Sequence, residues 1–74
     1  MADIVAALGE KALLDGFGLA GAAVHAAETD DDVRRAWASL TGRAGAVLLT
    51  PRAAAALGPA LADPHAPMTA VLPG

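Results

Sequence analysis

The chain has 74 residues, enough for one small domain, and carries a net charge of −3 with an isoelectric point near 5.0. This charge argues against nucleic-acid binding, because surfaces that follow phosphates are basic. Cysteine is absent, so we expect no disulfide and no thiolate metal site. No apolar run is long enough to cross a membrane, and Asp3 stands where a signal peptide would be basic. We therefore expect a cytoplasmic protein that does not insert into a membrane.

The apolar content is high, at 55%, but much of it is alanine, which buries little area. The larger residues expected to anchor the core are Ile4, Val5, Leu8, Leu13, Phe17, Val33, Trp37, Leu40, residues 47–49, Leu57 and Leu72. A core this thin often depends on a partner for stability.

The first half of the chain contains two expected strands and two expected helices. Residues 4–8 form a continuous apolar run, which predicts a strand buried on both faces. Leu13 and Phe17 lie one helical turn apart and predict a helix over residues 10–20 that closes at Gly21. Residues 22–27 predict a second strand.

A second helix is expected to begin at Thr29 or Asp30 and to end at Gly42. Its first turn is acidic, which suits the positive end of the helix dipole. Its buried stripe consists of Val33, Ala36, Trp37 and Leu40.

The second half predicts the central strand, a third helix and a last strand. Residues 44–50 hold the most apolar run. The Thr-Pro pair at 50–51 can cap and begin a helix, which the Gly-Pro pair at 58–59 should break. Residues 68–72 predict the fourth strand. Alternating strands and helices predict a three-layer α/β, Rossmann-like domain over residues 1–74, with a parallel sheet in the order 2-1-3-4.

Three helices cannot cover both faces of such a sheet. We expect an exposed apolar patch beside the first helix, over the third and fourth strands.

The segment 16–21, Gly-Phe-Gly-Leu-Ala-Gly, matches the dinucleotide fingerprint G-x-G-x-x-G. In dinucleotide-binding proteins that motif leaves a strand directly and opens a helix, whereas here it closes one. Helix packing and a C-cap are therefore favoured, and no cofactor is expected.

Other candidate sites are sparse. The loops at residues 9–11 and 50–52 flank the point where open α/β sheets bind ligands, but they offer only a weak phosphate loop and lack the acidic residues of a receiver domain. His25 and His65 have no third ligand at metal spacing, and the acidic run 30–32 is explained by the helix start. We find no activated nucleophile, so we expect no catalytic residue and no metal.

Residues 5–9 followed by residues 14–21 resemble the N-terminal segment of the F-subunit family of V-type and archaeal-type rotary ATPases, in which a strand leads to a helix reading G-F-x-L-A-G. Residues 47–50 with Arg52, and residues 67–73, resemble that family's third strand, helix start and proline-bracketed last strand.

The resemblance implies a non-catalytic component of the cytoplasmic central stalk of a proton- or sodium-translocating V-type ATPase or ATP synthase. Such a protein binds the coiled-coil rotor subunit of the V-type ATPase and, indirectly, the catalytic hexamer. Phe17, Leu19 and Gly21 are the implied partner-binding residues.

The sequence departs from the family at Gly18, where a basic residue is usual, and at the break at 58–59. It also ends at Gly74, where family members continue into a helical tail, and so resembles a short form. A stand-alone ligand-binding module at the loops around Gly9 and Thr50 is the alternative, and a minimal enzyme is a third reading.

Overall fold

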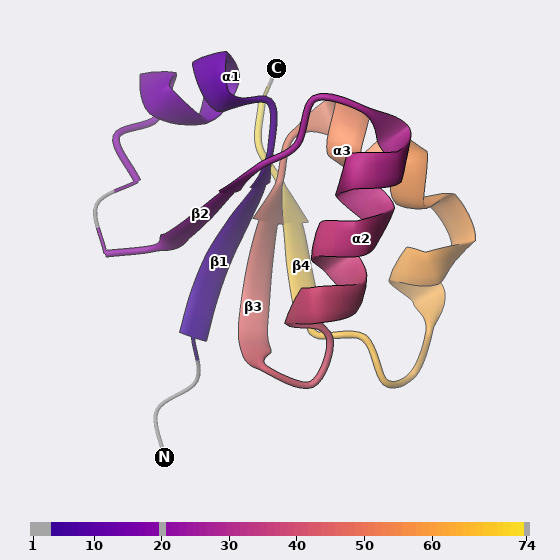
Figure 1. The fold of residues 1–74 in the computed structure, drawn as a ribbon. Helices are drawn as coiled ribbons and strands as arrows, with labels where there is room; N and C mark the ends of the chain where they lie inside the picture. Colours follow the sequence, from indigo (N-terminus) through magenta and orange to yellow (C-terminus); the bar gives the residue numbers. More distant parts are fainter. Residues whose placement is uncertain (1–3, 20, 74) are drawn as a thin grey trace.

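The computed structural model describes residues 4–19 and 21–73, which form a Rossmann-like α/β domain (Figure 1). The elements run in the order β1 (Ile4–Gly9), α1 (Lys11–Gly16), β2 (Ala23–Ala26), α2 (Asp30–Leu40), β3 (Ala44–Leu49), α3 (Pro51–Leu57), the 3-10 helix η1 (Gly58–Ala62) and β4 (Met68–Val71). The strands pair in parallel in the order β2-β1-β3-β4. The predicted fold class and strand order are confirmed.

The helices divide between the two faces of the sheet. Helices α2 and α3 lie on one side and α1 on the other (Figure 1). The main core lies under α2 and α3 and consists of Ala6, Leu8, Ala27, Val33, Trp37, Leu40, Val47, Leu49, Ala53 and Leu57. Ala7 and Leu14 are buried but stand outside this cluster, because they lie on the α1 side of the sheet.

Helices α2 and α3 begin where the sequence predicts, because a threonine side chain caps each of them. The Thr29 hydroxyl accepts a hydrogen bond of 3.1 Å from the Asp32 amide at the start of α2. The Thr50 hydroxyl accepts one of 3.3 Å from the Ala53 amide at the start of α3. Helix α3 ends where Gly58 takes a φ of +50°, and the chain continues as η1.

The first helix is much shorter than predicted. It ends at Gly16 and Phe17 is its C-cap, whereas the apolar spacing predicts a helix as far as residue 20. The physical reason is Gly18, whose φ of +57° turns the chain out of the helical path. A six-residue helix covers only one end of its face of the sheet.

The predicted core is only partly confirmed. The anchors that are buried are Leu8, Val33, Trp37, Leu40, Val47, Leu49 and Leu57. Leu13, Phe17, Leu48 and Leu72 are half-buried. Ile4 and Val5 are each 45% exposed. Val5 faces away from α2 and α3, on the face of the sheet that the short α1 covers only in part. The core is therefore small, and most of it lies on one face of the sheet.

Candidate functional site

The glycine-rich segment follows α1 and leads into β2, so it opens no helix. A dinucleotide fingerprint places its amides at the start of a helix, where they meet the pyrophosphate. Gly21 has a φ of +90° and is a turn residue on the way to β2. The structure thus agrees with the expectation that this segment lacks the setting of a nucleotide loop.

The three residues implied as partner-binding lie together in the connection between α1 and β2. Phe17 and Leu19 are half-buried and Gly21 is exposed, while residue 20 lies outside the described residues. All three are therefore accessible at least in part. Their role in partner binding stays a prediction.

The ends of β1 and β3 meet at the topological switch point, where they pack closely. The Thr50 amide donates a hydrogen bond of 3.1 Å to the Leu8 carbonyl. The Thr50 hydroxyl donates one of 2.5 Å to a carboxylate oxygen of Glu10. A Cβ added at Gly9 would overlap the Thr50 side chain, with the Thr50 Cβ only 2.7 Å away. The backbone of Gly9 therefore lies directly against the Thr50 side chain, and the two strand ends are closely packed at this point.

Two carboxylates of the chain itself accept hydrogen bonds from polar groups at this edge of the sheet. The hydrogen bond from Thr50 lowers the pKa of Glu10; burial works against this shift, and the charge of Arg52 adds to it. The other carboxylate is Glu28, which accepts a hydrogen bond of 3.0 Å from the backbone amide of Lys11, the first residue of α1. An incoming phosphate would therefore meet negative charge where doubly wound folds usually bind phosphates.

The face of the sheet opposite α2 and α3 is largely uncovered. Side chains alternate between the two faces of a strand, and paired residues in adjacent strands share a face. Residues flanking the core positions of β1 and β3, and their partners in β2 and β4, therefore point away from α2 and α3. We call this surface the open sheet face, and it consists of Val5, Val24, Ala46, Leu48, Met68 and Ala70.

The large apolar side chains on the open sheet face are strongly exposed to solvent. Val5 is 45% exposed, Val24 48% and Met68 78%, while Ala46 and Leu48 are half-buried. The predicted patch over the third and fourth strands is confirmed at β4 and only in part at β3, and its other exposed large side chains lie on β1 and β2. Large exposed apolar patches mark interaction surfaces in folded proteins.

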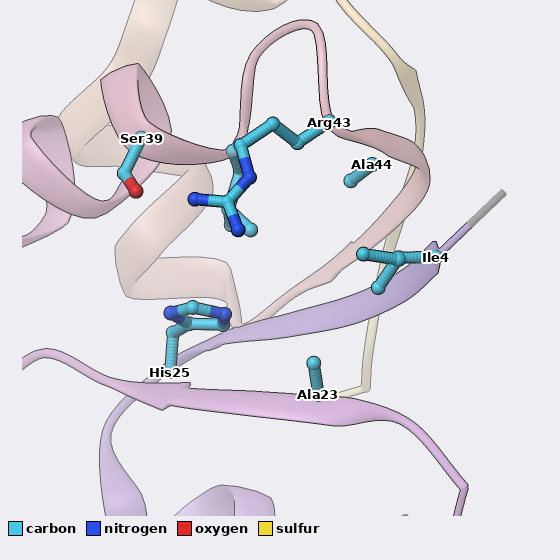
Figure 2. Close-up of a pocket in the computed structure, with 7 residues that line it drawn as sticks. Ile4, Ala23, His25, Ser39, Arg43 and Ala44 are labelled. Carbon is cyan, nitrogen blue, oxygen red and sulfur yellow. The ribbon is translucent and has the colours of Figure 1, made fainter.

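A small cleft lies at the other end of the sheet from the switch point (Figure 2). Its volume is about 120 Å³, and its apolar walls come from Ile4, Ala23, Leu40 and Ala44. Its polar side chains are those of His25, Ser39 and Arg43, and the Arg43 guanidinium reaches back toward Ser39 and the His25 ring. This cleft was not predicted from the sequence, since its residues come from several different elements. The signal that could have indicated the cleft is the parallel pairing of the strands, because it sets the beginnings of the strands side by side.

The remaining candidates have structural explanations. Among residues 4–19 and 21–73, no three histidine and acidic side chains gather as a metal site would require. The three aspartates 30–32 form the first turn of α2, and Asp31 pairs with Arg34 at 2.9 Å. His65 lies in an exposed turn, where its amide donates to the Asp63 carboxylate.

The longest described helix, α2, has 11 residues, and none of the described helices is long and apolar enough to cross a membrane. In comparisons with known proteins, no protein-family model matches this chain, and no curated protein matches it.

Proposed function

We propose that this chain is a non-catalytic docking protein in the central stalk of a V-type or archaeal-type rotary ATPase, and that it binds the coiled-coil rotor subunit through the open sheet face. The observation that carries the docking role is the exposure of Val5, Val24 and Met68 on one uncovered sheet face. The identity of the partner rests on the resemblance of residues 5–9, 14–21 and 67–73 to the F-subunit family.

The open sheet face has a suitable shape for helices. Four strands spaced about 4.8 Å apart make a surface about 14 Å across. One α-helix with its side chains is about 10–12 Å wide, so the surface fits one helix of a coiled coil and part of the next. The small side chains of Ala46 and Ala70 allow a helix backbone to approach, and the flexible Met68 can adapt to the groove between helices.

The alternative, a ligand-binding module at the switch point, has less support. The strand ends are closely packed where Gly9 contacts Thr50, and Glu10 and Glu28 place negative charge there. None of these side chains has the arrangement of an activated nucleophile with its base.

Native mass spectrometry of the chain mixed with a coiled-coil stalk protein from the same genome tests the proposal. We expect a one-to-one complex at micromolar concentration and near-physiological salt. A chain that stays a free monomer or forms only a homodimer would contradict it. A thermal-shift screen of nucleotides and anions tests the alternative, because a ligand at 100 times its Kd stabilises the fold by about 2.7 kcal/mol.

A further inference from the structure

The cleft at the beginning of the strands brings together three hydrogen-bond donors from three parts of the chain. Ser39 comes from the last turn of α2, Arg43 from the connection before β3, and His25 from β2. A guanidinium offers five N–H donors in a planar fork, while a neutral imidazole and a hydroxyl offer one each. Figure 2 shows these groups around one space, with Ile4 and Ala44 on its far side.

Among the described residues that line the cleft, the charged side chain is that of Arg43, although the chain as a whole is acidic. None of the described residues that line the cleft is a carboxylic acid. Elsewhere, Lys11 and Arg34 are paired with aspartates at 2.7 and 2.9 Å, and Arg52 lies near Glu10. Among the described residues, the guanidinium of Arg43 makes no hydrogen bond or ion pair. Its charge is therefore available to a ligand.

We infer that this cleft binds one small oxyanion, a carboxylate or a phosphate group, through Arg43, His25 and Ser39. A volume of about 120 Å³ is comparable to the roughly 150 Å³ cavity that holds benzene in another protein, and so suits a group of four or five heavy atoms. Bidentate hydrogen bonding of guanidinium to an oxyanion is among the strongest polar contacts in proteins.

The end of α2 works against anion binding, since the C-terminus of a helix is partly negative. Two of its carbonyls are already engaged. The Trp37 carbonyl accepts hydrogen bonds of 2.9 Å from both the amide and the hydroxyl of Thr41, and the Leu40 carbonyl accepts one of 2.9 Å from the Arg43 amide. The positive side chain of Arg43 then lies nearest to the ligand. The cleft is on the α2 side of the sheet, so this inference does not depend on docking through the open sheet face.

The test is an NMR titration of the ¹⁵N-labelled chain with potassium phosphate and, separately, with sodium acetate, each against potassium chloride at equal ionic strength. We expect saturable shifts confined to the amides around His25, Ser39 and Arg43. Saturation by acetate alone would identify the ligand group as a carboxylate, as on a partner protein, and saturation by phosphate alone would identify a phosphoryl group. Saturation by both salts would show a site for oxyanions in general, which also supports the inference. Shifts that do not saturate, or that equal those caused by chloride, would overturn the inference.

Two variants that each lose one positive charge distinguish a specific binding site from general electrostatic attraction of anions. Arg43→Met should weaken binding at least tenfold, whereas Arg52→Met, at the other end of the sheet, should leave it within twofold. Equal losses in both variants would overturn the inference. Arg43→Lys keeps the charge and loses the planar fork, so it should show an intermediate loss, and it serves as the test if Arg43→Met does not fold.

Discussion

The hydroxyl of Thr50 donates a hydrogen bond of 2.5 Å to the carboxylate of Glu10, which lies 40 residues earlier in the chain. The same hydroxyl accepts a hydrogen bond from the Ala53 amide at the start of α3. Thr50 is fully buried, so one small side chain both caps a helix and ties the end of β3 to the loop that follows β1.

Replacing Thr50 with valine should destabilise the fold more than the same change at Thr29. Thr50→Val keeps the shape but loses both a cap and a hydrogen bond to a charged group, and we expect a loss of about 2–3 kcal/mol. Thr29 is exposed and only caps α2, so Thr29→Val should cost about 1 kcal/mol. Urea unfolding of both variants measures this difference, and equal losses would contradict the role given to Thr50.

The hydrogen bond from Thr50 also predicts a pH dependence. It lowers the pKa of Glu10 below its ordinary value of about 4.5, so the ionised form stabilises the folded state above that pH. The stabilisation is lost as the pH falls through the lowered pKa. Wild type should therefore be more stable than Glu10→Gln near pH 7, and the gap should close in acid. A gap that stays constant from neutral to acidic pH would show that the charge of Glu10 contributes nothing.

Gly9 should tolerate no side chain. A Cβ there would overlap Thr50, and its φ of +156° disfavours other residues, so we expect Gly9→Ala to cost about 1–3 kcal/mol. Gly16 is the matched control, because it is helical and has nothing within 4 Å of an added Cβ. Gly16→Ala should be neutral or stabilise by up to about 1 kcal/mol. Thermal unfolding of the two variants measures this difference. A Gly9→Ala variant as stable as wild type would contradict the close approach of Gly9 to Thr50.

Phe17 should matter less to stability than a buried anchor does. Complete burial of an aromatic ring makes its truncation cost about 3–5 kcal/mol, but Phe17 is only half-buried, so Phe17→Ala should cost about 1–2 kcal/mol. Leu14 is buried on the same side of the sheet, and Leu14→Ala should cost at least as much, about 2–4 kcal/mol. Denaturant unfolding compares them. If Phe17→Ala is the more damaging, Phe17 is a core residue and not an accessible one.

The parts of the fold that local chemistry determines could be predicted from the sequence. The threonines before α2 and α3, Pro51, and the glycine-proline pair at 58–59 set helix ends through groups within a few residues. The alternation of strands and helices, with its short connections, then restricts the sheet to few orders. That is why the strand order was predicted correctly.

What was missed depends on backbone conformation or on distant contacts. The spacing of Leu13 and Phe17 continues a helical pattern, and only the left-handed conformation of Gly18 shows that the helix has ended. The contacts of Thr50 with Gly9 and Glu10 join residues about 40 positions apart. The cleft beside Arg43 needs the register of adjacent strands. None of these follows from the pattern of a single segment.

Docking of the partner on the open sheet face can be tested within a single strand. Met68 and Val71 both lie in β4 and are 78% and 54% exposed, but they point to opposite faces. The measurement is the Kd of wild type, Met68→Lys and Val71→Lys for the coiled-coil stalk protein, by calorimetry, with unfolding curves to show that each variant stays folded. Docking through the open sheet face predicts at least a tenfold weakening for Met68→Lys and less than twofold for Val71→Lys. Equal effects, or a larger effect at Val71, would contradict it.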